Sequence, residues 1–157
     1  MGEVMRELLT LILLCLFLTS CEVYNSSNSN IDLELSEATE MWNSYNLQNY
    51  TFVNSRSCEC LPPYDYTVEV VNGEINDIYF DLQKDINYEK KDRIISTTRT
   101  IDELFDLLVK YEETADQFEV EFNEEFGYPT NIKIDPSREI ADEEIILEIS
   151  KLLFINN

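Results

Sequence analysis

The fold of this chain is decided by Tyr64-Asp65-Tyr66-Thr67-Val68-Glu69-Val70-Val71-Asn72-Gly73-Glu74-Ile75-Asn76-Asp77-Ile78-Tyr79-Phe80-Asp81. Two runs of strand-like composition flank the dipeptide Asn72-Gly73. Asn-Gly is the strongest short signal for a β-hairpin, because both central positions of the tight turn need a positive φ. The stretch therefore predicts two antiparallel strands, 64–71 and 74–81, joined by a two-residue turn.

Two segments, one on either side of this hairpin, have the apolar spacing of amphipathic helices. Ser36 can cap the first, whose apolar stripe is Ala38, Met41, Trp42 and Tyr45. Thr100-Ile101-Asp102-Glu103 is a capping box for the second, in which Thr100 and Glu103 satisfy each other's backbone amides. The second stripe has the same spacing and consists of Ile101, Leu104, Phe105 and Leu108.

Further strands are predicted at 50–57, at 117–123, where apolar residues alternate with Glu, and in a segment that opens at Tyr128-Pro129. The stretch 82–99 is rich in charge without a clear period, and we expect a solvated connection there. The segment 143–154 is ambiguous between two assignments. A helix would align Ile145, Ile149 and Leu152, and a strand would align Ile145, Leu147 and Ile149.

With the last segment as a strand, the chain contains two tandem αβββ halves. We expect an α+β fold in which one antiparallel β-sheet carries two helices packed on one face. Residues 36–157 number about 120, a size that suits a single domain with one core.

Several short motifs in this domain resemble the bacterial family DUF6174. They are Tyr50-Thr51-Phe52, Arg56-Ser57-Cys58-Glu59-Cys60-Leu61-Pro62-Pro63, Val68-Glu69-Val70-Val71-Asn72-Gly73, Thr100-Ile101-Asp102-Glu103-Leu104-Phe105, Phe126-Gly127-Tyr128-Pro129-Thr130 and Ile140-Ala141-Asp142-Glu143-Glu144. The family has no assigned activity, so the resemblance implies localisation and architecture but no chemistry. It favours a strand for 143–154.

Near the N-terminus, an apolar run at 8–19 is closed by the lipobox Leu18-Thr19-Ser20-Cys21. The run of about 12 residues is too short to span a bilayer, which needs roughly 20. We therefore expect 1–20 to be a lipoprotein signal peptide and Cys21 to be acylated, with the protein lipid-anchored and extracytoplasmic in a bacterial cell envelope. Glu3, Arg6 and Glu7 sum to minus one where a basic start is expected, and a start at Met5 would leave Arg6 against Glu7 and the amino group. An uncleaved anchor and a buried core segment are the alternatives.

Residues 21–35 are mostly polar and cannot bury enough apolar surface to offset their ordering entropy. We expect a flexible tether of about 20 Å root-mean-square reach.

The formal net charge is −21, from 11 basic and 32 acidic residues. The longest basic run is Lys90-Lys91, between Glu89 and Asp92, so the chain lacks the clustered cations that a nucleic-acid binder needs. The acidity is explained either by solubility or by binding of cations or a basic partner. We expect no nucleic-acid partner.

The chain contains no histidine. This excludes Ser-His, Cys-His and His-zinc sites within it. There is neither a GxGxxG motif nor a P-loop among the three glycines. We expect no catalytic residues and no cofactor, although pairs of carboxylates are abundant.

Cys58 and Cys60 are the strongest candidates for chemistry, because they are the only thiols left after processing and acylation. In an oxidising compartment we expect them to form a disulfide. Four roles remain open for them: a structural link that fixes a strand bulge, thiol-disulfide exchange, a copper or other soft-metal site, and separate thiols. Arg56 lies on the same strand face and would lower a thiol pKa.

A calcium site is the other metal hypothesis. It would use Asp135, Glu139, Asp142, Glu143 and Glu144. The spacing fits no EF-hand, and Arg138 intrudes, so a solvated acidic loop is the alternative and no metal is expected.

We therefore expect a non-catalytic binding or interaction module whose partner is an envelope protein or a small ligand. It would use an exposed sheet face that bears Tyr50, Tyr64, Tyr66 or Tyr79, since tyrosine suits interfaces. Arg56 and Tyr128 are candidate binding residues. The alternative is a thiol-disulfide redox or soft-metal protein centred on Cys58 and Cys60.

Overall fold

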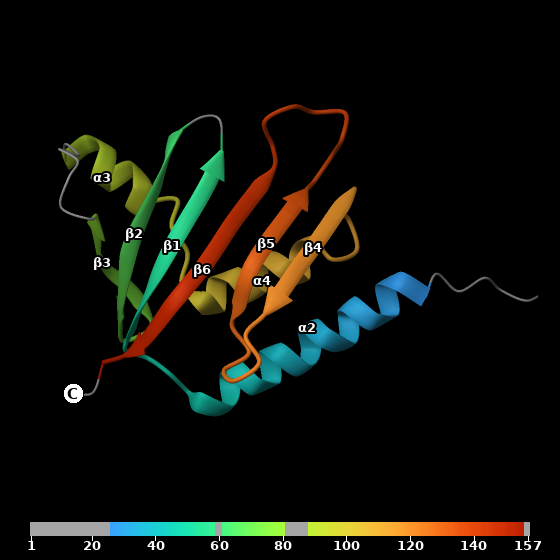
Figure 1. Cartoon of the computed structure of the whole chain (residues 1–157), viewed down its shortest axis with the longest axis horizontal. Helices are drawn as coiled ribbons and strands as arrows, with labels where there is room; N and C mark the ends of the chain where they lie inside the picture. The colour runs from blue at the N-terminus through green and yellow to red at the C-terminus, as the bar shows by residue number, and fades with distance from the viewer. Residues whose placement is uncertain (1–25, 59–60, 81–87, 156–157) are drawn as a thin grey trace, which may run out of the picture.

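Six antiparallel strands form a single sheet in the order β3-β2-β1-β6-β5-β4 in the computed structural model (Figure 1). The structure describes residues 26–58, 61–80 and 88–155, and the side chains within 32–55, 65–80 and 91–155. The strands are β1 (Tyr50–Cys58), β2 (Leu61–Val71), β3 (Glu74–Phe80), β4 (Gln117–Phe122), β5 (Pro129–Asp135) and β6 (Ile145–Phe154). The helices are α2 (Ser26–Tyr45), α3 (Tyr88–Ile95) and α4 (Ile101–Tyr111).

The sheet is made of two three-stranded meanders that lie edge to edge. Strands β1, β2 and β3 form the first, and β4, β5 and β6 form the second. They join where β1 pairs antiparallel with β6, with Arg56 opposite Leu147 and Tyr50 opposite Phe154. The α+β class and the antiparallel sheet are thus confirmed, and so is the strand assigned to the ambiguous last segment.

The hydrophobic core lies on one face of the sheet. Helices α3 and α4 lie behind the sheet in Figure 1, and α2 crosses below its lower end. Trp42 of α2 packs edge-on against Tyr50, with ring centroids 5.4 Å apart. The largest fully buried side chains include Trp42, Tyr50, Phe52, Val68, Val70, Ile78, Ile101, Leu108, Ile132, Ile134 and Ile149.

Two local signals in the sequence formed as predicted. Asn72 and Gly73 both have positive φ, 56° and 78°, as the tight turn requires. Thr100 and Glu103 form a reciprocal capping box: Thr100 Oγ1 accepts from the amide of Glu103 at 3.2 Å, and a carboxylate oxygen of Glu103 accepts from the amide of Thr100 at 2.8 Å. The turn reverses the chain between β2 and β3, and the capping box sets the start of α4.

The predicted boundaries were wrong in two places. Helix α2 begins at Ser26 rather than after Ser36, so it takes in ten residues of the expected tether (26–35). Leu35, only 3 % exposed, extends the apolar stripe by one turn, and this packing favours helix. The expected connection 82–99 contains α3, whose Ile94 is buried in the core.

No helix within the described ranges is both long enough and apolar enough to cross a membrane.

Candidate functional site

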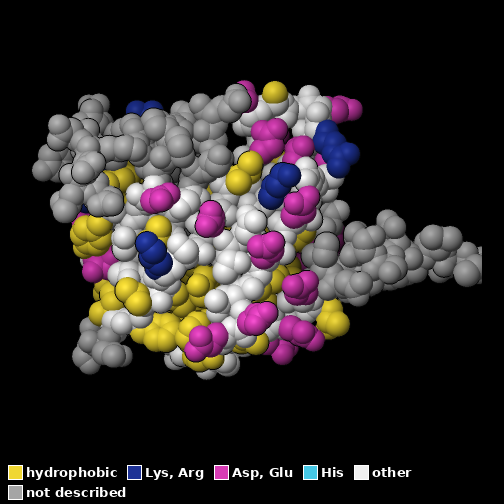
Figure 2. Space-filling view, viewed as in Figure 1, with side chains coloured by type: hydrophobic (Ala, Val, Ile, Leu, Met, Phe, Trp, Pro, Cys, Tyr) yellow, Lys and Arg dark blue, Asp and Glu magenta, His cyan; other side chains and the backbone are white. Residues whose placement is uncertain are grey.

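The face of the sheet opposite the helices is uncovered in the described part of the chain (Figures 1 and 2). Because side chains alternate between the two faces of a strand, the pairing register shows which residues share this face. Its acidic side chains are Asp65, Glu69, Glu74, Asp77, Glu119, Glu121 and Glu148. We call this surface the open face.

The side chains in the middle of the open face are small and at most weakly polar. Half-buried residues cross its central strands: Thr51, Val53, Ser55, Thr67 and Ser150. Carboxylates surround them, and Lys133 lies opposite Glu119 in the β4–β5 ladder. Figure 2 shows more acidic than basic side chains over these strands. The open face therefore combines a weakly polar, half-buried centre with a negative border.

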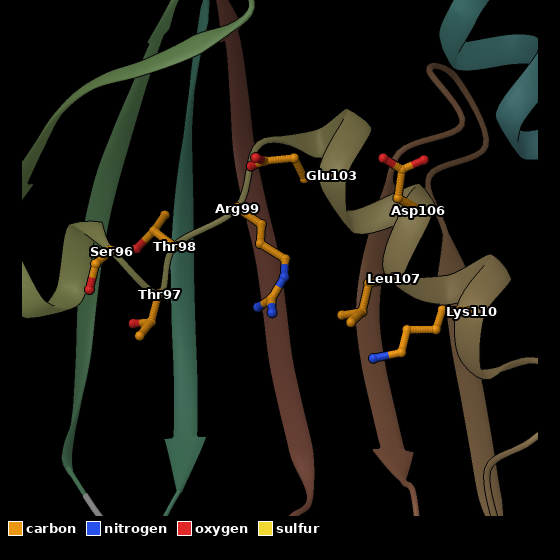
Figure 3. Close-up of a pocket in the computed structure, with 8 residues that line it drawn as sticks. All are labelled: Ser96, Thr97, Thr98, Arg99, Glu103, Asp106, Leu107 and Lys110. Carbon is orange, nitrogen blue, oxygen red and sulfur yellow. The ribbon is translucent and has the colours of Figure 1, made fainter.

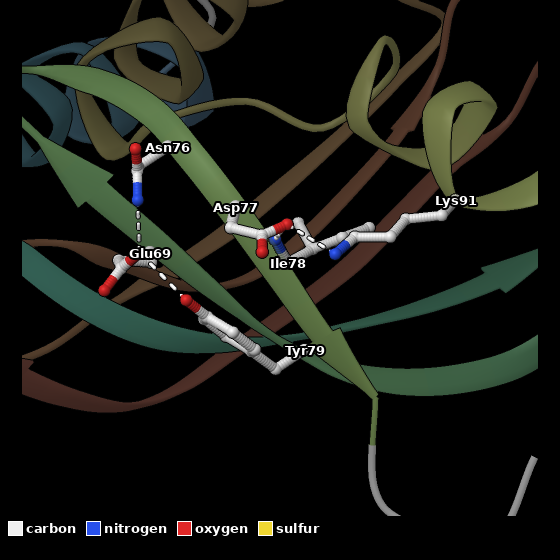
Figure 4. A network of polar contacts seen from close by, with 6 residues as sticks. All are labelled: Glu69, Asn76, Asp77, Ile78, Tyr79 and Lys91. Carbon is white, nitrogen blue, oxygen red and sulfur yellow. Dashed lines mark hydrogen bonds and ion pairs between the residues drawn. The ribbon is translucent and has the colours of Figure 1, made fainter. Parts of the chain in front are cut away.

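A polar network orders the outer edge of the open face at β3 (Figure 4). Tyr79 Oη donates to Glu69 Oε2 at 3.0 Å, and Asn76 Nδ2 donates to the same oxygen at 2.5 Å. This hydrogen bond to Glu69 raises the pKa of Tyr79, because losing the phenol proton would set two negative charges together.

Asp77 is the best-paired carboxylate of the open face. Lys91 reaches it from α3, with Nζ 2.5 Å from Oδ1, and the Lys91 ammonium also lies 5.9 Å from the centroid of the Tyr79 ring. The hydrogen bond from Lys91 lowers the pKa of Asp77. Lys91 thus offsets the charge of Asp77, whereas no described cation forms an ion pair with the other carboxylates of the face.

A second feature is a hollow of about 420 Å³ between α3 and α4 (Figure 3). Residues 96–99, which link the two helices, line one side. One face of α4 lines the other with Glu103, Asp106, Leu107 and Lys110. Positions three, four and seven residues apart share one side of a helix, so this wall follows directly from the helical period.

A chain of buried hydrogen bonds supports the hollow from beneath. Asn54 Nδ2 lies 2.9 Å from Tyr66 Oη, which lies 3.0 Å from Thr98 Oγ1, and Thr98 Oγ1 donates to the carbonyl of Ile94 at 2.8 Å. Since the one Thr98 hydroxyl proton goes to Ile94, Tyr66 donates to Thr98. The chain ties the sheet to the end of α3.

The predicted tyrosine surface was wrong in part. Tyr50 and Tyr66 are 0 % and 5 % exposed and belong to the core, whereas Tyr79 is 49 % exposed on the open face. Burial of Tyr50 raises the pKa of its phenol, whose oxygen accepts from the amide of Ile101 at 3.1 Å. The side chain of Tyr64 lies outside the described part.

Tyr128, a candidate binding residue, is 6 % exposed, and burial raises its pKa. It stands just before β5 within the core, and its side chain does not lie on an exposed surface. Arg56 lies in β1 with its backbone opposite Tyr64 and Leu147, and its side chain lies outside the described part.

The cysteine predictions fall largely outside the described residues. Cys58 ends β1, where the pairing with β2 shifts register between Arg56 and Cys58, and its side chain is not described. Cys60 and Cys21, the predicted lipidation site, also lie outside the described part. The disulfide and the acylation therefore stay predictions.

The expected acidic loop forms the connection from β5 to β6. Asp135 Oδ1 accepts from the amide of Ser137 at 3.1 Å, so this carboxylate holds a turn. No group of three or more His, Cys, Asp or Glu side chains suited to a metal ion occurs among the residues that the structure describes.

The hollow was missed at the sequence level. The signal for its α4 wall was present in the spacing of Glu103, Asp106, Leu107 and Lys110, but its other wall depends on α3, which was not predicted. Arg99 belongs to no sequence motif that would mark it as a site residue.

Residues 34–153 match the family of unknown function DUF6174. No curated protein matches the chain. No solved structure matches it either. The family match covers most of the 157 residues, including every strand and α4, and the chain therefore belongs to DUF6174.

Proposed function

We propose that this chain is a lipid-anchored, non-catalytic docking protein of a bacterial cell envelope, which holds a basic protein partner on its open face. One observation carries the proposal: the six-stranded sheet is covered by helices on one face only, and the other face is bordered by carboxylates. Folds of this kind usually bury one sheet face and leave the other for solvent or a partner.

The charge of the open face selects the partner. Five of its carboxylates are exposed around a weakly polar centre, namely those of Asp65, Glu74, Glu119, Glu121 and Glu148. Asp77 is paired with Lys91, and Glu69 accepts hydrogen bonds from Tyr79 and Asn76. A basic surface would find complementary charge at the border and would meet no buried ion at the centre. Such complementarity speeds association and excludes acidic competitors.

The size of the face suits a specific contact. Six strands at about 4.8 Å spacing, each of about seven residues at about 3.3 Å rise, give an area on the order of 600 Å². A stable interface buries about 800 Å² per partner, so the open face supplies most of one.

The predicted anchor fits this role. Loss of Glu3, Arg6 and Glu7 with the leader leaves a net charge of −20, and an anionic membrane surface repels such a domain. Two or more acyl chains on Cys21 would hold the protein durably while the domain faces away from the lipid.

Carbodiimide cross-linking in intact cells tests the docking proposal, because the reagent joins a carboxylate directly to a lysine in contact with it. We expect cross-links to a basic envelope protein that map by mass spectrometry to the border of the open face, Glu119 and Glu148 above all, and that weaken as salt rises.

A pair of variants makes the test specific. The open-face variant carries Glu69→Gln, Glu119→Gln, Glu121→Gln and Glu148→Gln. The control carries Glu37→Gln, Glu40→Gln, Glu113→Gln and Glu139→Gln, all exposed and away from the open face. Both change the net charge equally, and circular dichroism checks that both fold. Cross-linking lost only in the first supports the proposal. Equal cross-linking in both, or cross-links mapped elsewhere, overturns it.

A further inference from the structure

We propose that the hollow between α3 and α4 binds a small hydroxylated anion, such as a sugar acid or a sugar phosphate. The site is separate from the open face, because it lies on the helical side of the sheet (Figures 1 and 3). Its volume of about 420 Å³ falls within the range of small-molecule sites.

Arg99 supplies the anion contact. No described residue forms an ion pair or a hydrogen bond with its guanidinium, although the chain is rich in carboxylates. Figure 3 shows the Arg99 side chain extending into the hollow from the link between the helices. A guanidinium binds carboxylate and phosphate groups through paired N–H donors, so an unpaired Arg99 is available for either.

Lys110 places a second cation on the facing wall. Its side chain points across the hollow toward Leu107 and Arg99 in Figure 3, and its Nζ lies 4.6 Å from the centroid of the Tyr111 ring. The two cations come from different elements, one from the link and one from the third turn of α4. Together they form a positive pair across one small space.

The carboxylates of the wall point away from this pair in Figure 3. The Glu103 carboxylate is held by the amide of Thr100 in the capping box. The carboxylate of Asp106 points away from the hollow in Figure 3. The remaining negative charge of the protein is screened over about 8 Å at physiological ionic strength, so the nearest groups decide which ion binds.

Hydroxyl oxygens on the other side explain why the ligand is hydroxylated. Ser96 Oγ donates to the carbonyl of Arg93 at 2.9 Å, and Thr97 Oγ1 donates to the carbonyl of Ile94 at 3.1 Å. Ser96 and Thr97 are exposed and line the hollow, and because the Ser96 proton is donated to Arg93, its oxygen can still accept a hydrogen bond. A ligand hydroxyl can donate to Ser96 Oγ while its anionic group meets Arg99.

The base of the hollow is ordered in advance. Thr98 is fixed by the chain that runs from Asn54 through Tyr66 to Ile94. Asn54 Oδ1 is buried beside this chain without a hydrogen-bond donor among the described residues. A rigid floor lowers the entropy lost on binding.

Isothermal titration calorimetry on the full chain in detergent micelles tests the site with four probes: glucuronate, glucose 6-phosphate, glucose and inorganic phosphate. We expect saturable binding of one or both charged sugars, weaker binding of inorganic phosphate and none of glucose. Glucuronate and glucose 6-phosphate separate the carboxylate from the phosphate source. Absence of binding by both charged sugars, or equal binding of glucose, overturns the proposal.

Arg99→Gln should weaken binding of the charged sugar by about tenfold or more, and Lys110→Gln by a smaller factor. Arg138→Gln removes the same charge from an exposed loop and should leave affinity unchanged. Lys110 is exposed on α4, so its variant remains informative if Arg99→Gln fails to fold. Equal affinity of the Lys110, Arg99 and Arg138 variants would show that the hollow does not bind the ligand.

Discussion

A Cβ atom on Gly127 would lie 2.5 Å from the carbonyl oxygen of Ala38. The loop between β4 and β5 therefore rests directly on the backbone of α2. Tyr45 Oη donates to the carbonyl of Glu125 at 2.9 Å and strengthens the same contact. Gly127 and Glu125 thus hold this loop against α2.

Replacement of Gly127 by Ala should destabilise the protein strongly. The change combines the strain of a positive φ, about 1–2 kcal/mol, with a clash against backbone that cannot rotate away, about 1–3 kcal/mol more. Gly73→Ala is the matched control, because its φ is also 78° but its new Cβ meets only the flexible side chain of Gln48. Urea unfolding should place the Gly127 variant below the Gly73 variant, and equal losses would contradict this contact.

Tyr50→Phe should lower the free energy of unfolding by about 1–3 kcal/mol, since the buried amide of Ile101 would lose its acceptor at the start of α4. Tyr79→Phe removes a hydroxyl that donates to Glu69 at the surface, and it should change stability by less than about 1 kcal/mol. Chemical denaturation of the two variants in parallel measures the difference. Similar values would mean that the Tyr50 hydroxyl does not support the helix.

Stability should fall in alkaline solution. Burial raises the pKa of Tyr50, so the unfolded chain loses this proton at lower pH than the folded protein does. The stabilisation is fully present below about pH 10, the ordinary pKa of tyrosine, and declines above it by about 1.4 kcal/mol per pH unit. Unfolding curves from about pH 9 to 11 should be steeper in pH for the wild type than for Tyr50→Phe. Parallel pH dependences would contradict this assignment.

Cys21→Ser should abolish acylation of the protein. Without a thiol, acyl chains cannot be attached, and the expected leader is not removed as in a lipoprotein. Intact mass should therefore show fatty acid on the wild type alone and the complete leader on the variant. A Cys15→Ser control should keep its fatty acid, and a wild type without fatty acid would disprove the anchor.

The reduction potential of the Cys58 and Cys60 pair separates a structural link from a redox centre. For a docking protein we expect a potential below about −300 mV, as structural disulfides have. A redox centre would lie nearer to that of the thiol oxidants, and its exchange with partner proteins would stop in Cys60→Ser. Thiol trapping in defined redox buffers makes the measurement.

The sequence was most reliable where a few neighbouring residues determine the backbone. Asn72-Gly73 and the Thr100–Glu103 box were predicted because their geometry is set within four residues. Helix α3 was missed since its eight residues are mostly charged, and it gains its place from contacts distant in sequence: Ile94 in the core and Lys91 on Asp77.

The prediction of which tyrosines are exposed was wrong in part, although the alternation of the strands contained the information. Tyr66 lies in phase with Val68 and Val70, and all three are buried; Tyr79 lies in phase with Asp77 and is exposed. Period-two alternation separates two faces but does not say which one the helices cover. The apolar neighbours on each face give that information.

The pairing of β1 with β6 sets the order in which this protein can mature. The ribosome makes β1 about ninety residues before β6, so the seam at the centre of the sheet stays open through most of synthesis. Because β6 fills the position between β1 and β5, the sheet cannot close until β6 has been made, and the two meanders stay separate until then.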